Sequence, residues 1–288
     1  MRMKVLAFGE VLWDIYEDDK YIGGAPLNFA AHFKKCGGES WLITAVGNDF
    51  LGNETVENKE KMGVNTEYVT YNDRETGKCL VTLDDNQIPA YNLLDNVAYD
   101  FIEEPDLNSD YDVLYFGTLA LRHEYNRDVL KRILSDNKFE DVFVDINIRP
   151  PYYSKEIIKF ACNNATILKI SDEELPMVME LLEKSVSLIE NTAKNLCEEF
   201  RNLKIVIITR GEKGSFVYNS VSQETFECDA SKVNVVSTVG AGDSFSASFL
   251  AEYLKTEDIM HALNFATRIS GYVVSQKDAV PEYDIHAE

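Results

Sequence analysis

Short apolar runs alternate with amphipathic stretches along most of this chain. The runs are rich in β-branched residues and have the length of buried strands, at residues 5–8, 113–116, 142–146, 166–170 and 205–209. Between them, apolar residues recur near i, i+3 and i+4 at residues 27–35, 53–62, 126–134, 175–182, 188–200, 244–254 and 259–275. This alternation predicts an α/β fold, a mostly parallel central sheet with helices on both faces.

One region breaks the alternation. From residue 65 to residue 91 strand follows strand, with turn residues at 72–73 and 84–86 and no stretch of helix length between them. Together with residues 12–22, this region is expected to form a small sheet that projects over the main body. No internal repeat or long linker divides the sequence, so residues 1–288 are expected to form one domain.

Composition excludes several classes of partner. The chain has 288 residues and a formal net charge of −21, which argues against binding to nucleic acid or to an anionic membrane surface. No uninterrupted apolar stretch approaches the roughly 20 residues that a spanning helix needs. The five cysteines are scattered and form no CxxC pair, so we expect buried thiols and a cytoplasmic location.

The segment 237–245, STVGAGDSF, places two glycines and an aspartate where a loop turns into an apolar helix. Free N–H groups and the helix dipole would converge there, which suits a phosphate. Gly240 and Gly242 carry no Cβ and would let a phosphoryl group approach the backbone, with Asp243 at the rim as a candidate base. The alternative is a Gly-rich turn whose helix is capped by Asp243. The spacing is not that of a Walker A loop.

Further polar residues follow predicted strands. Asn147 and Arg149 come just after a buried strand, where open α/β sheets bind their ligands. Arg149 could clamp a γ-phosphate or an anionic part of the substrate, or it could form a structural ion pair. The other candidates at strand ends on the same predicted edge are Lys169, Glu174, Thr209 and Gly211.

Two motifs far apart in the chain resemble one family. STVGAGDSF resembles the DTxGAGD signature of the ribokinase-like sugar kinases, also called the phosphofructokinase-B type, and GGAPLNFAA at 23–31 resembles that family's amino-terminal Gly-Gly element with its substrate-side asparagine, Asn28. Further similar elements lie at 9–14, 45–49, 117–122, 145–150 and 209–215, so the resemblance covers almost the whole chain. Three of the elements, GGAPLNFAAH, GTLALR and DINIRP, are most similar to those of bacterial fructokinases.

The resemblance implies a ribokinase-like three-layer αβα sandwich whose small sheet, from about 12–22 and 65–91, is a lid. It implies ATP and Mg²⁺ as cofactors and phosphoryl transfer to a sugar hydroxyl, with Asp243 as general base and the Gly240–Ala241–Gly242 backbone as anion hole. The implied sugar-binding residues are Asp14, Gly24, Asn28, Asn147 and Arg149. The implied nucleotide-binding residues are Lys169, Glu174, Thr209, Gly211, Thr238 and Asn264, with Glu174 also acting on magnesium through water.

Several of these residues could instead have a purely structural role. Asp14 could lie in a surface turn, Asn28 could cap a helix, Glu174 could stabilise a helix dipole, and Asn264 could lie on a helix surface. The four histidines show no metal-ligand spacing and are expected in solvent or in the core, although His32 and His123 could approach the sugar.

The sequence also departs from the family pattern. Ser237 stands where the family has an aspartate, which puts a monovalent-cation site in doubt. Ser171 replaces an asparagine before the Glu-Glu pair, which could alter magnesium organisation, and Asp278 replaces the glycine of a Gly-Ala pair near the adenine side.

The expected activity is conversion of fructose to fructose 6-phosphate. A kinase for ribose or 2-keto-3-deoxygluconate remains open, and so does a sugar-binding regulatory protein that has lost catalysis, because of Ser237 and Ser171. The exposed face of a lid sheet would suit a homodimer.

Overall fold

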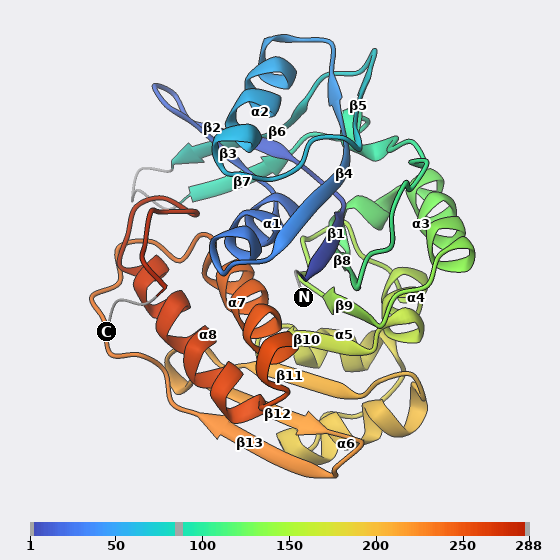
Figure 1. Ribbon diagram of the computed structural model, residues 1–288, viewed down its shortest axis with the longest axis vertical. Coiled ribbons are helices and arrows are strands. Elements are labelled where there is room, and N and C mark those ends of the chain that lie inside the picture. The colour runs from blue at the N-terminus through green and yellow to red at the C-terminus, as the bar shows by residue number, and fades with distance from the viewer. Residues whose placement is uncertain (1–2, 84–88, 286–288) are drawn as a thin grey trace.

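The computed structural model describes residues 3–83 and 89–285. Its central sheet has nine strands in the order β13-β12-β11-β10-β9-β8-β1-β4-β5 (Figure 1). Neighbouring strands are parallel from β11 to β5, whereas β12 and β13 add an antiparallel hairpin at one edge. The strands are β13 (Glu224–Cys228), β12 (Ser215–Asn219), β11 (Ile205–Thr209), β10 (Ile167–Ser171), β9 (Asp141–Asp145), β8 (Val113–Gly117), β1 (Lys4–Phe8), β4 (Glu39–Gly47) and β5 (Val69–Asn72).

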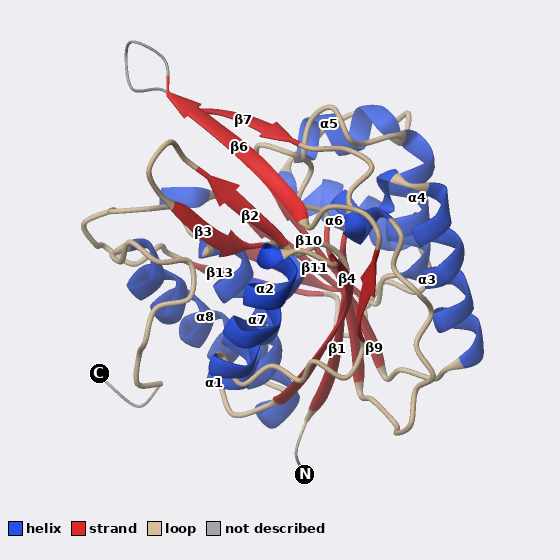
Figure 2. Cartoon of the chain, turned by 90° about the horizontal axis from the view of Figure 1, so that it is seen from above, coloured by secondary structure: helices blue, strands red, loops and turns tan. Residues whose placement is uncertain are grey.

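Helices cover both faces of this sheet, as the sequence predicts (Figure 2). One apolar core joins the sheet to α3 (Glu124–Asp136), α4 (Lys155–Asn164), α5 (Leu175–Leu181) and α6 (Ile189–Glu199). The other core joins it to α1 (Ala25–Lys35), α7 (Ala241–Thr256) and α8 (Ile259–Val274). The fold is therefore the predicted three-layer sandwich. Among the described residues, no helix has both the length and the apolar character that crossing a membrane requires.

A second, smaller sheet lies beyond the main body, in the order β3-β2-β6-β7. Its strands are β2 (Leu12–Ile15), β3 (Lys20–Gly23), β6 (Gly77–Leu83) and β7 (Pro89–Leu93). β2 pairs with β6 in parallel and the other two pairs are antiparallel. The sheet has its own apolar core, which includes Leu12, Cys79 and Tyr99, and Trp13 Nε1 donates to Thr55 Oγ1 of α2 (Phe50–Lys61) at 2.8 Å.

The prediction for residues 65–91 is wrong in one part. Val69–Asn72 pairs with β4 and belongs to the central sheet, since β4, α2 and β5 form a crossover that returns parallel to β4. Only β6 and β7 from this region join β2 and β3. The turn predicted at 84–86 lies outside the described residues.

Several elements were not predicted. Strand β4, helix α4 and the β12-β13 hairpin belong to the central sandwich; β4 and α4 carry clear apolar patterns that were overlooked, whereas the edge of the hairpin carries a weak one. β13, for example, reads ETFEC and is mostly exposed, because it is an edge strand with one neighbour only. Three short 3₁₀ turns complete the described elements: η1 (Ala98–Asp100), η2 (Leu119–Arg122) and η3 (Gly211–Lys213).

The strand order reverses at β1. From β1 the chain passes to β4 on one side, then returns to β8 on the other side and continues to β9, β10 and β11 in succession. In an open parallel sheet, ligands bind at such a switch point, beyond the carboxyl ends of the strands. The residues that follow β1, β8, β9 and β10 are therefore the first place to look for a site.

Candidate active site

The start of α7 has the geometry of a turn that could bind an anion. Gly240 precedes the helix in the left-handed conformation, with φ 79° and ψ −5°, and a Cβ there would lie 2.4 Å from the Ala279 carbonyl oxygen. The Ala241 N–H is bonded to the Thr238 carbonyl at 3.3 Å. Within the described part of the chain, the N–H groups of Gly242 and Asp243 have no acceptor. Two free donors at a helix N-terminus fit a phosphoryl oxygen.

Asn28 and Asp243 meet beside this turn, although 215 positions separate them. Asn28 Nδ2 donates to Asp243 Oδ2 at 2.8 Å, and the two side chains are only 4% and 8% exposed. Neither residue caps its helix, because the N-cap positions of α1 and α7 are occupied by Gly24 and Gly240. The capping alternatives for Asp243 and Asn28 are therefore wrong.

A buried ion pair lies directly behind the turn. Lys169, on β10, donates to Asp145 Oδ2 at the end of β9 at 2.8 Å, with both side chains almost wholly buried. Ser246 Oγ of α7 lies 3.0 Å from the same carboxylate oxygen. Lys169 Nζ would be 3.3 Å from a Cβ on Gly242, so the ammonium group lies against the first turn of α7. The strand ends and the helix start are thus held together by one polar network.

The carboxyl group of Asp243 titrates far from its ordinary range. Burial raises the pKa of Asp243 to about 6; the Asn28 hydrogen bond opposes the rise, Asp145 adds to it, and Lys169 and Arg149 oppose it. A carboxylate whose pKa is close to the working pH is suited to accept a proton.

Two neighbours of Asp243 were not singled out as site residues in the sequence. Glu10, which follows β1, is 4% exposed, and its Oε2 has no hydrogen-bond partner in the described part of the chain. Burial raises the pKa of Glu10 to about 7, and Asp243 adds to the rise. The Tyr115 hydroxyl is also buried without a described partner, and its pKa is raised by burial and then by Asp145, Asp243 and Glu10. Position after a buried strand, the criterion applied to Asn147, would have found Glu10.

Three further predicted sugar-binding residues are Asp14 on β2 and, in the segment after β9, Asn147 and Arg149. Asp14 belongs to strand β2 of the small sheet, opposite Cys79 in the register, so it neither directly follows β1 nor lies in a surface turn. Burial raises the pKa of Asp14, while Cys79 and then Arg149 counteract the rise. Asn147 has a left-handed backbone, φ 41°, which turns the chain away from β9.

Arg149 is exposed and forms no ion pair among the described residues, contrary to the structural alternative. Its positive charge nevertheless acts on Glu10, Asp14 and Asp243 together. Arg149 is therefore a cation that faces the site and is open to a ligand.

Glu174 is bound to the ends of two strands. Its Oε1 accepts the Ile148 N–H after β9, and its Oε2 accepts both the N–H and the hydroxyl of Ser171 at the end of β10. The Glu174 N–H in turn lies 3.2 Å from Ser171 Oγ, so the two residues form a reciprocal S-x-x-E capping arrangement. Ser171, the departure from the family asparagine, is thus used to orient Glu174.

The remaining predicted nucleotide residues lie on separate elements. Thr209 ends β11 beside Ser171, and its carbonyl accepts the Asp172 N–H at 2.8 Å. Gly211 begins η3 and Thr238 lies in the loop before α7, and both are exposed. Asn264 on α8 contacts Cys228 Sγ at 3.4 Å. In the described part of the chain, no hydrogen bond or ion pair joins these residues to Asp243, whose side chain bonds Asn28. Ser237 Oγ accepts the Val239 N–H at 3.2 Å and so orders the loop before α7.

A stretch of exposed valines between β13 and α7 was also missed. Val235 and Val236 are 65% and 63% exposed, and the Val236 N–H is bonded to the Val274 carbonyl at the end of α8. These exposed apolar side chains offer a surface for a flat ring.

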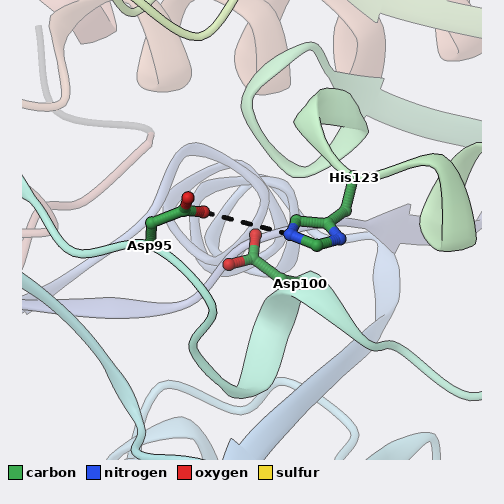
Figure 3. A group of neighbouring side chains, drawn as sticks. All are labelled: Asp95, Asp100 and His123. Carbon is green, nitrogen blue, oxygen red and sulfur yellow. Dashed lines mark ion pairs between the residues drawn. The ribbon is translucent and has the colours of Figure 1, made fainter.

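A group of possible metal ligands lies elsewhere, near the small sheet. Asp95, Asp100 and His123 have side-chain atoms within 4.8 Å of one another, and Figure 3 shows the His123 ring beside both carboxylates. Arg122 already donates to both oxygens of Asp100, at 2.7 and 2.8 Å. Because this guanidinium neutralises the buried carboxylate, the group is explained as an ion-pair cluster.

Comparison with known proteins agrees with this geometry. The profile of the pfkB family carbohydrate kinases matches residues 5–284. The probable fructokinase-5 of Arabidopsis thaliana is 29% identical over 96% of this chain and 93% of its own length. The ATP-dependent 6-phosphofructokinase of Thermoanaerobacterium thermosaccharolyticum is 26% identical over 96% of this chain and 89% of its own length. The chain belongs to the pfkB family of carbohydrate kinases, which are phosphotransferases.

Solved structures extend the comparison to the fold. A sugar kinase of Pyrococcus horikoshii in complex with ATP superposes with a TM-score of 0.82 at 25% identity, over 96% of this chain and 94% of that one. The fructokinase of Vibrio cholerae O395, with fructose, ADP and calcium bound, gives a TM-score of 0.82 at 22% identity, over 98% and 96% of the two chains. The ribokinase-like fold is thereby established, and the structures with bound ATP identify ATP as a substrate of such kinases.

Proposed function

We propose that this protein is a fructokinase that transfers the γ-phosphoryl group of ATP to a hydroxyl of fructose and forms fructose 6-phosphate. One observation carries the proposal above all others: a buried carboxylate, Asp243, held by Asn28 next to two free N–H groups at the start of α7. A base and an anion site in contact are what transfer from a phosphate to an alcohol requires. A protein that only binds sugar would need neither.

In the proposed reaction, Asp243 accepts the proton of the sugar hydroxyl as its oxygen attacks the γ-phosphorus. The new O–P bond forms while the bond between the γ-phosphorus and the β,γ-bridging oxygen breaks, and ADP leaves with that electron pair. The N–H groups of Gly242 and Asp243 stabilise negative charge on the transferred group. Asn28 orients the base, and Asp14 and Gly24 would bind other hydroxyls of the sugar.

The nucleotide would lie along the carboxyl edge from β10 to β11. Thr209, Gly211 and Thr238 line this edge, and Lys169 adds a positive charge behind the anion site. Magnesium would enter with ATP, held mainly by its phosphates and by water on Glu174, whose carboxylate is fixed by Ser171 and Ile148. The exposed Val235 and Val236, next to the end of α8, would receive the adenine ring.

Arg149 supports a second candidate. An exposed guanidinium without an ion pair in the described chain, facing the acceptor side, would suit an acceptor with a carboxylate, such as 2-keto-3-deoxygluconate. With a neutral acceptor, the same group would contact the γ-phosphate. Arg149→Gln therefore separates the two: a raised KM for the acceptor alone indicates an anionic acceptor, whereas a lower kcat with the acceptor KM unchanged indicates contact with the phosphate.

The test of the proposal is ADP release from Mg-ATP with fructose, ribose, glucose, 2-keto-3-deoxygluconate, tagatose 6-phosphate and adenosine as acceptors. We expect the highest kcat/KM with fructose. A preference for 2-keto-3-deoxygluconate, lost in Arg149→Gln, would replace fructose by a sugar acid. Sugar binding without ADP release from any acceptor would favour the non-catalytic alternative.

The pH profile follows from the state of Asp243. Only the deprotonated carboxylate accepts a proton, so log(kcat/KM) is expected to rise with pH, to bend at the Asp243 pKa of about 6, and to stay level above it. Because the Asn28 hydrogen bond lowers this pKa, Asn28→Ala should move the bend to higher pH. Initial rates with saturating Mg-ATP and varied acceptor measure the bend in both proteins.

Glu10 titrates nearby and needs a control. Its pKa of about 7 could produce a second bend, so the profile is repeated in Glu10→Gln, which keeps the shape of the side chain and removes its titration. The bend that remains belongs to Asp243. A flat profile in Glu10→Gln between about pH 5 and pH 8 would contradict the role of Asp243 as base.

We also propose that the small sheet is a lid of the single domain formed by residues 1–288. Asp14 on β2 brings this sheet into the site, and closure over the sugar would exclude water. Leu80 and Tyr91, on β6 and β7, are 37% and 61% exposed and support a homodimer through this sheet. The five free cysteines, four of them buried, support a reducing cytoplasm.

A further inference from the structure

His32 lies on the same helix as Asn28, one turn later, and is completely buried. Both of its ring nitrogens have partners in the segment that follows α8. Nε2 lies 2.9 Å from the Ala279 carbonyl oxygen, and Nδ1 lies 2.7 Å from the Tyr283 hydroxyl. The Tyr283 ring stacks on the imidazole, with centroids 5.7 Å apart and planes inclined by 16°. His32 therefore joins α1 to the end of the chain.

The partners fix the tautomer. A carbonyl oxygen can only accept, so Nε2 carries the hydrogen and donates it to Ala279, while the Tyr283 hydroxyl donates to Nδ1. The neutral ring is satisfied on both sides. Burial lowers the pKa of His32 to about 4, so the ring keeps this state at neutral pH.

Ala279 also touches the anion turn. The Gly240 Cα faces the Ala279 backbone so closely that a Cβ would lie 2.4 Å from its oxygen and 2.9 Å from its Cα. The Ala279 peptide is thus enclosed between His32 on α1 and Gly240 at the start of α7. α1 and α7 pack side by side, as Figures 1 and 2 show, so both walls of this enclosure are rigid helices.

We infer that His32 is a positioning residue: by holding the Ala279 carbonyl against Gly240, it fixes the left-handed turn that aims the N–H groups of Gly242 and Asp243 at the transferred phosphoryl. The inference rests on the anion site proposed above. Helix α1 then supports the site in two ways: Asn28 orients the base, and His32 holds the segment that packs against the anion turn. The two halves of the site therefore share one support.

The test compares His32→Leu, which keeps the volume but cannot donate, with His32→Gln, whose amide can donate to Ala279 and accept from Tyr283. We expect His32→Leu to lower kcat by about tenfold or more and to raise the KM for ATP, with the acceptor KM within about twofold, because a turn displaced by a fraction of an ångström loses alignment. His32→Gln should recover most of kcat. Tyr283→Phe, which removes one hydrogen bond and keeps the stacked ring, should give an intermediate kcat.

Glu282→Gln is the matched control. Glu282 lies on the same segment as Ala279 and Tyr283, and its substitution removes an exposed ion pair to Lys35 without changing the contacts of Ala279. It should leave all kinetic constants unchanged. A His32→Leu protein with a lower Tm but wild-type kcat and KM at a temperature where it is fully folded would overturn the inference and leave His32 as a core residue.

Gly240→Ala separates failure of this inference from failure of the anion site. If Gly240→Ala loses activity while His32→Leu keeps it, the anion site stands and the role of His32 falls. If Gly240→Ala is fully active, the anion turn itself is misassigned, and the inference falls with it.

Discussion

Asp243→Asn is expected to lower kcat by about 10³-fold, within the range attributed to a positioned general base. The carboxamide cannot take the proton of the attacking hydroxyl, but its oxygen can still accept the hydrogen bond from Asn28 Nδ2 that Asp243 accepts at 2.8 Å. The fold and sugar binding should therefore survive. ADP release under saturating Mg-ATP and acceptor gives kcat, and calorimetric titration with the acceptor gives its affinity.

Asp128→Asn provides the same chemical change at an exposed ion pair on α3 and should leave kcat unaltered. The assignment of Asp243 as base fails if Asp243→Asn retains more than about a tenth of the wild-type kcat while binding the acceptor normally. A variant that has lost both binding and its thermal transition would point to a structural role instead.

Lys169→Met is expected to have the largest effect on stability, a loss of about 3–5 kcal/mol in the free energy of unfolding. The methionine fills the space but leaves the Asp145 carboxylate buried without a cation; among the described side chains, only the Ser246 hydroxyl still donates to it. The pKa of Lys169 points the same way: burial alone would lower it, yet Asp145 and the neighbouring Glu174 and Asp243 raise it. Urea unfolding followed by fluorescence measures the loss.

Lys131→Met is the matched control, because Lys131 pairs with Asp128 at 2.9 Å with both side chains about half exposed. A solvated pair of this kind contributes about 0.5 kcal/mol or less. The double variant Lys169→Met/Asp145→Leu removes the orphaned carboxylate and should regain part of the stability. If Lys169→Met is no more destabilising than Lys131→Met, the buried pair does not hold the strand ends and α7 together.

The fold could be predicted because its signals are local. Runs such as 113–116 and 205–209 are apolar on both faces, and they became β8 and β11 within one residue of the expected ends. The prediction was wrong where the pairing of a strand determines its sheet. Val69–Asn72 has the same pattern as the strands of the small sheet, and only the position of β4 determines which sheet it joins. The hairpin edge strand β13 was missed because one neighbour and one exposed face leave little apolar pattern.

For the site, the sequence placed Asn28 and Asp243 from two motifs, but it did not indicate that they touch. Asp145 and Ser246 were not identified as site residues, because their roles come from contacts between distant segments. Asp145 accepts a hydrogen bond from Lys169, and Ser246 donates to Asp145. Asp145 does give one signal, a charged residue at the carboxyl end of a strand whose middle is apolar. Glu174 was predicted as a ligand of water on magnesium, whereas its anchoring by Ile148 depends on the segment after β9 meeting the turn that follows β10.

The packing of α1 against α7 bears on how the protein is made on the ribosome. Leu27, Phe29 and Phe33 of α1 are completely buried, and part of their cover is α7, which is translated more than 200 residues later. Until α7 emerges, the apolar side of α1 has only the sheet to pack against, which makes the growing chain a substrate for chaperones. A chain cut before Gly240 would lack Asp243, the proposed base, as well as this cover, so we expect the fragment released by interrupted synthesis to be inactive.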